Sequence, residues 1–118
     1  MKNEKLDIVD RTFKFGIRVV KLAKSLPRTS VGFAIAGQIV RSGTSVGANV
    51  EEAQSAISKK EFVQKLQIAL KEARETRYWI KVIIEGEVIT KTKLENLLDE
   101  ANQLTGILNA IIINAKKK

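Results

Sequence analysis

Residues 94–115, LENLLDEANQLTGILNAIIINA, carry a regular apolar repeat that indicates the fold class of this chain. An apolar residue recurs along them at alternating steps of three and four, which is the spacing of core positions in packed helices. These positions are Leu94, Leu97, Ala101, Leu104, Leu108, Ile111 and Ala115. The repeat predicts a helix over about residues 91–115, capped by Thr90 or Thr92, with one face in the core of a helix bundle.

The segment before this repeat carries both a helix start and a helix stop. Ser58-Lys59-Lys60-Glu61 fits the Ser-x-x-Glu capping box, in which the hydroxyl and the carboxylate each accept from an otherwise unpaired backbone N–H. Gly86 is a typical residue at the end of a helix. A third helix is therefore expected over residues 59–86.

The single proline, Pro27, divides the first half of the chain. Proline cannot continue a helix, so the first helix is expected over residues 6–26. Thr29 or Ser30 then offers an N-cap for a second helix over residues 31–57. The stripe that supports this helix is Ile35, Ile39, Ser42, Val46, Val50, Ala53 and Ile57.

Small residues fill the middle of the second helix, at residues 42–48. Because their helix propensity is poor, they either let a neighbouring helix approach closely or break the helix in two, and close packing is favoured. No hairpin-type turn separates alternating apolar runs. The sequence therefore predicts an all-α fold, an antiparallel up-and-down four-helix bundle in one domain over residues 1–118.

Two of these helices carry apolar residues on more than one face. On the first helix, the stripe expected to face the core is Leu6, Val9, Phe13, Gly16, Ile17 and Val20, and a second stripe is Ile8, Phe15, Val19, Leu22 and Leu26. On the third helix, the expected core stripe is Phe62, Leu66, Ala69, Leu70, Ala73, Ile80 and Ile84, and the second set is Ile68, Trp79 and Val82.

A second apolar face on a soluble helix indicates self-association or a partner, because monomers rarely expose large apolar patches. The sequence thus predicts a homo-oligomer. The residues expected at its interface are Ile8, Phe15, Val19, Leu22, Ile68, Trp79 and Val82. The alternative is that the helices are nearly surrounded within one bundle.

Charge distinguishes a third face on the same two helices. The chain has 21 Lys and Arg against 13 Asp and Glu, a net charge of +8, and no acid occurs between Arg11 and Val50. The aligned cations are Arg11, Lys14, Arg18 and Lys21 on the first helix, and Lys60, Lys71, Arg74 and Lys81 on the third. Such ridges can track phosphates, although a solvated helix face has the same composition. With no aromatic residue interleaved for base stacking, contact with the nucleic-acid backbone is favoured over base contact.

The composition argues against an enzyme. The absence of histidine and cysteine excludes the usual catalytic triads, thiol nucleophiles and His-ligated metal sites. Glu72 and Glu75 share a helix face with Lys71, Arg74 and Arg77 nearby, so an ion-pair network is favoured over a magnesium site. The glycines form no phosphate-binding loop. No catalytic residue, metal, cofactor or small-molecule substrate is expected.

The sequence also bears on location. It contains no signal-peptide pattern and no apolar run long enough for a membrane span, and its lack of cysteine is compatible with a reducing cytosol. A cytoplasmic protein that does not enter the membrane is expected.

Four sequence blocks occur in a distinctive order. They are Leu26-Pro27, QIVRSGTSVGANVEEA at residues 38–53, SKKEF at residues 58–62 and EARETRYW at residues 72–79. On these blocks, and over nearly its whole length, the chain resembles the bacterial four-helix-bundle proteins encoded in intervening sequences of large-subunit ribosomal RNA genes. The family often has a proline before Ala48-Asn49, where this chain has Gly47.

The resemblance implies a ring-shaped homopentamer without catalytic residues. The chain is also similar to the accessory variability proteins of diversity-generating retroelements, which implies a basic barrel that binds nucleic acid and a reverse transcriptase. The family's polar positions match Arg41, Asn49 and Glu52, whose expected role is hydrogen bonding between helices or subunits, with a shared RNA contact as the alternative.

Two functions follow as expectations. The first is a non-enzymatic, homo-oligomeric basic module that binds RNA or DNA through phosphate contacts. Its expected contact residues are Arg11, Lys14, Arg18, Lys21, Lys71, Arg74 and Lys81. The alternative is a protein-interaction scaffold that docks an acidic protein or a partner enzyme.

Overall fold

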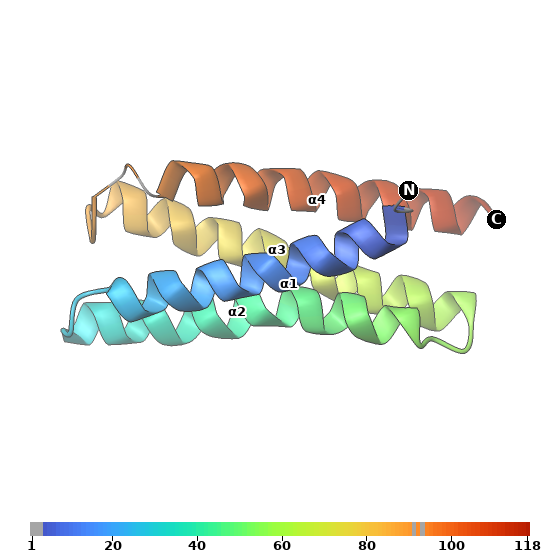
Figure 1. Cartoon of the computed structure of the whole chain (residues 1–118), viewed down its shortest axis with the longest axis horizontal. Helices are drawn as coiled ribbons and strands as arrows, with labels where there is room; N and C mark the ends of the chain where they lie inside the picture. The colour runs from blue at the N-terminus through green and yellow to red at the C-terminus, as the bar shows by residue number, and fades with distance from the viewer. Residues whose placement is uncertain (1–3, 91, 93) are drawn as a thin grey trace.

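The computed structural model describes residues 4–90, 92 and 94–118, with side chains from Asp7 onward. These residues form four long α-helices (Figure 1): α1 (Glu4–Ser25), α2 (Ser30–Gln54), α3 (Lys59–Glu85) and α4 (Leu94–Lys117). Consecutive helices run in opposite directions and pack side by side, and α4 returns beside α1. The predicted all-α, antiparallel bundle is confirmed.

The helix ends follow the capping signals. Thr29 accepts a hydrogen bond from the Gly32 N–H at 3.1 Å, and Ser58 accepts one from the Glu61 N–H at 3.0 Å. The α3 helix stops before Gly86, as predicted, but the residue with a left-handed backbone is Glu87, at φ 53°.

One boundary of the second helix differs from the prediction. The α2 helix ends at Gln54 rather than at residue 57, and Ile57 is 93% exposed in the connection to α3. The expectation that Ile57 extends the core stripe is therefore wrong. The start of the fourth helix was expected at residue 91, which lies outside the described residues, as does the side chain of Leu6.

The core runs the length of the bundle between the four helices. The repeat in α4 faces it as predicted, with Ile111 and Ala115 half-buried near the end. Its largest fully buried side chains are Phe15, Ile39, Leu66, Ile80, Ile83, Leu94, Leu104 and Leu108. Four helices thus share one continuous hydrophobic interior.

The prediction for α1 assigned its two apolar faces the wrong way round. Phe13 and Ile17, expected in the core, are 59% and 43% exposed. The core instead receives the second stripe, represented by Ile8, Phe15 and Val19, all at most 2% exposed. These three residues therefore cannot form an outer interface for another subunit, and that part of the interface prediction is wrong.

The packing of α1 against α2 explains why the stripe with Ile8, Phe15 and Val19 enters the core. Thr12 lies at the middle of the buried stripe, and its hydroxyl donates to the Ile8 carbonyl at 2.8 Å, so a polar residue is buried without losing a hydrogen bond. An ideal Cβ on Gly43 would lie 2.6 Å from Val19 Cγ1, and one on Gly47 would lie 3.0 Å from the Thr12 carbonyl oxygen. The small residues of α2 therefore admit α1 at short range, and the prediction of close packing is confirmed because α2 is unbroken.

The faces of α3 agree better with the sequence. Leu66, Ala69, Leu70, Ala73 and Ile80 are buried, as predicted, while Phe62 and Ile84 are half-buried. Of the second set, Trp79 and Val82 are half-buried against the core, whereas Ile68 is 41% exposed.

Candidate nucleic-acid interface

Arg11 differs from the other cations of the α1 ridge because it holds two helices together. Its Nη2 and Nε donate to the Glu100 carboxylate of α4 at 2.7 and 3.2 Å, and Nη2 also donates to Gln103 at 3.0 Å. The hydrogen bonds to Glu100 raise the pKa of the Arg11 guanidinium. Arg11 was expected to contact phosphate, but the structure shows its charge neutralised inside the chain.

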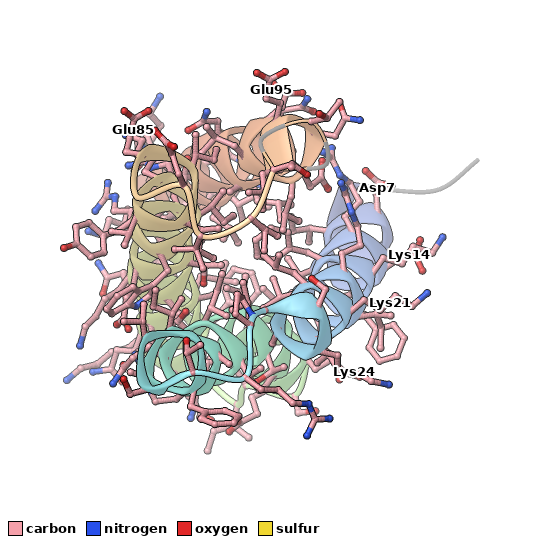
Figure 2. All side chains as sticks on the ribbon, turned by 90° about the vertical axis from the view of Figure 1, so that its left-hand side faces the viewer. Asp7, Lys14, Lys21, Lys24, Glu85 and Glu95 are labelled. Atoms are coloured by element: carbon pink, nitrogen blue, oxygen red, sulfur yellow. The ribbon has the colours of Figure 1, made fainter. Side chains whose placement is uncertain are left out.

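The rest of the α1 ridge projects outward. Lys14, Arg18 and Lys21 are exposed, and Lys14 forms an i,i+4 pair with Asp10 at 3.0 Å. Figure 2 shows Lys14 and Lys21 pointing away from the bundle together with Lys24, which is not part of the predicted ridge. A solvent-facing row of cations therefore remains along α1 without Arg11.

The α3 stripe is exposed along its whole length, at Lys60, Lys71, Arg74 and Lys81. The structure does not bring it together with the α1 ridge. In the end view of Figure 2, α1 and α3 lie on opposite sides of the bundle, each in contact with α2 and α4. One straight segment of nucleic acid therefore reaches only one of the two ridges of a single chain.

An ion-pair network joins α2 to α3 next to the α3 stripe. Arg41 Nη1 donates to Glu72 Oε1 at 3.1 Å and its Nη2 to Glu75, while the Trp79 indole N–H donates to Glu75 at 3.3 Å. Helical spacing predicts Lys71, Arg74 and Arg77 around these carboxylates. It does not predict Arg41, because that residue lies 31 positions before Glu72 and only packing places them side by side.

The other polar positions of α2 also bond within the chain. Glu52 accepts from Lys65 of α3 at 3.0 Å, and Asn49 donates to the Ser45 carbonyl of its own helix at 2.8 Å. Interhelix bonding is thus confirmed for Arg41 and Glu52.

Acid is expected to weaken this network. The hydrogen bond from Arg41, and a weaker one from Trp79, lower the pKa of Glu75 from its ordinary value of 4.5. Because the folded-state pKa is the lower one, the stabilisation is fully present above about 4.5 and disappears as pH falls through the folded value. As the pH is lowered from about 7, the melting temperature of Arg41→Gln should therefore fall less steeply than that of the parent. Equal slopes of melting temperature against pH for the two proteins would contradict this account.

The described residues give no sign of a metal or membrane site. They contain no cluster of three or more metal-ligating side chains, and none of their helices is long and apolar enough to cross a bilayer. A cavity of about 900 Å³ opens at the end of the bundle near the α2–α3 connection. Its lining is mainly hydrocarbon, including Ile8, Phe62 and Ile111.

Comparison with known proteins assigns the chain to a family. Its sequence matches the 23S rRNA-intervening sequence protein family over residues 4–110. Among solved structures, it is similar to a protein of unknown function from the S23 ribosomal protein family of Bacteroides thetaiotaomicron, with 39% identity and a TM-score of 0.87. The similarity covers 93% of this chain and 98% of that one. Comparison with curated proteins gives no match. The chain therefore belongs to the 23S rRNA-intervening sequence protein family.

Proposed function

We propose that this protein is a non-catalytic, homo-oligomeric basic module that binds RNA or DNA through phosphate contacts. The proposal rests on one observation, namely which charged side chains are paired within the chain and which face solvent unpaired. The carboxylates of Glu72, Glu75 and Glu100 bond to arginines between helices. Arg18, Lys21, Arg74 and Lys81 face solvent, and none has an ion-pair partner in the part of the chain that the structure describes.

Exposed lysines and arginines bind a phosphate backbone by displacing its condensed counterions, which makes affinity fall with added salt. Each phosphate contact contributes about 0.7 to the slope of log K against log salt for a single strand and about 0.9 for a duplex. The two ridges lie on opposite sides of the bundle. We therefore treat them as separate contact surfaces that are to be tested one at a time.

Charge-neutralising variants test the proposal. One replaces Lys71, Arg74 and Lys81 with glutamine, a second replaces Lys14, Arg18 and Lys21, and a control replaces Lys116, Lys117 and Lys118 with the same change in net charge. If one ridge binds phosphates, its variant should lower the salt slope for single-stranded RNA by about 2, while the control stays near the parent value. Equal effects in all three variants would indicate attraction by net charge alone. Absence of binding to both RNA and DNA at low salt would reject the proposal and favour the protein-scaffold alternative.

Exposed apolar side chains support the self-association part of the proposal. Phe13 and Ile17 lie one turn apart on α1, and Val31 and Phe33 lie near the start of α2, with exposures from 43% to 62%. Contact with another subunit would remove this surface from water. The family resemblance implies a ring of five.

Light scattering tests this part directly. The double variant Phe13→Asp, Ile17→Asp should reduce the particle mass toward that of one chain, because it would bury two carboxylates in the interface. The matched control is Ile113→Asp on α4, which is 48% exposed and lies outside the proposed surface. A monomeric parent protein, or equal masses for all three proteins, would contradict self-association through α1.

A further inference from the structure

Tyr78 lies within the basic stripe of α3, although it belongs to none of the faces predicted for this helix. Its side chain is 59% exposed. Arg74 precedes it by four residues and Lys81 follows it by three, and at these spacings residues are neighbours on one helix face. The expectation that no aromatic residue interrupts the cations is therefore wrong for this helix.

The ring of Tyr78 is supported on one side by a neighbouring aromatic ring. It meets the ring of Trp79 edge to face, with 5.2 Å between centroids and 74° between planes. Trp79 is in turn half-buried and bonded to Glu75, which is bonded to Arg41. The interhelix network thus supports an aromatic ring that faces solvent between two cations.

We infer that the face formed by Lys71, Arg74, Tyr78 and Lys81 binds single-stranded nucleic acid, with a base stacked on Tyr78 and the flanking phosphates paired with the cations. The inference rests on the proposed function and specifies the form of nucleic acid. A duplex keeps its bases paired and stacked inside, so an aromatic ring on a convex helix surface reaches only unpaired bases. Stacking uses the π-face that every base has, so the surface selects single strands without selecting sequence.

The charge around the ring favours this ligand over an apolar partner. Arg74 and Lys81 have no carboxylate within ion-pair distance among the described residues, so burying them under an apolar surface would leave two unpaired charges. A phosphate backbone neutralises them and places its bases within reach of the ring. An exposed aromatic ring next to unpaired cations therefore matches nucleic acid better than it matches an apolar partner.

Two substitutions at Tyr78 provide the test. The full-length protein is titrated into labelled oligo(U), and separately into a duplex RNA of equal length, at about 50 mM salt. Tyr78→Ala should weaken binding to oligo(U) by about 5- to 30-fold, the lower part of the range for losing one stacked base, and leave duplex binding unchanged. Tyr78→Phe keeps the π-face and should bind like the parent.

The single tryptophan gives an independent signal. Because Trp79 contacts Tyr78, oligo(U) should quench its fluorescence in the parent and in Tyr78→Phe, and much less in Tyr78→Ala. Arg74→Gln serves as a phosphate-contact control that should weaken single strands and duplex alike.

The outcomes separate the inference from the proposed function. If Tyr78→Ala binds oligo(U) like the parent, or weakens oligo(U) and duplex equally, stacking on Tyr78 is excluded while phosphate binding stands. If the parent binds neither of these RNAs, nor single-stranded or duplex DNA of equal length, both are rejected. Thermal melting of each variant shows whether it is folded, and because Tyr78 is exposed, melting should change little.

Discussion

Phe15→Ala is expected to destabilise the fold by about 3–5 kcal/mol, whereas Phe13→Ala should change stability by less than about 0.5 kcal/mol. The two phenylalanines are two positions apart on one helix, but Phe15 is 1% exposed and Phe13 59% exposed. Truncating Phe15 removes a buried ring and leaves a cavity between α1 and its neighbours. Truncating Phe13 removes a ring that the single chain leaves in water.

Thermal and urea unfolding at low protein concentration measure this difference. At about 4 °C per kcal/mol for a domain of this size, Phe15→Ala should melt about 12–20 °C below the parent. If the subunits associate through α1, the melting temperature of the parent should rise with protein concentration, and of the two variants only Phe13→Ala should show a smaller rise. Greater destabilisation by Phe13→Ala than by Phe15→Ala would mean that the face predicted from the sequence is the buried one.

Gly43→Ala has the second-largest expected effect. The added Cβ would lie within 3 Å of three carbon atoms of Val19, a fully buried and β-branched side chain that cannot rotate away. Relief requires α1 and α2 to separate, at an expected cost of about 1–3 kcal/mol, which outweighs the gain of about 1 kcal/mol in helix propensity.

Two other glycines of α2 provide comparisons for this prediction. Gly47→Ala should also destabilise, because its Cβ would meet the backbone of Thr12 and Phe13. Gly37→Ala is the matched control: nothing lies within 4 Å of its Cβ, so the substitution should stabilise by about 0.5–1 kcal/mol. Denaturant unfolding of the three variants provides the comparison. Stabilisation by Gly43→Ala equal to that by Gly37→Ala would show that the helices are not in close contact there.

The candidate site was only partly predictable. The exposed positions of Arg18, Lys21, Arg74 and Lys81 follow from helical spacing, which needs no knowledge of neighbours. The pairing of Arg11 with Glu100 does not, because 89 residues separate them and only the return of α4 beside α1 brings them together. The exposure of Tyr78 is not predictable from the sequence alone, since tyrosine is intermediate between typically buried and typically exposed residues.

Local signals along the chain specify where its helices begin and end. Capping residues at Thr29 and Ser58, the helix-ending Pro27 and the apolar repeat of residues 94–115 are local signals, and local backbone sterics and hydrogen bonds respond to them directly. By contrast, which apolar stripe of α1 enters the core depends on how the helices pack together. The two stripes are similarly apolar, so burial by itself barely distinguishes them. The deciding contact is made by α2, where Gly43 and Gly47 receive Val19 and Thr12, and that fit depends on two helices meeting rather than on either sequence alone.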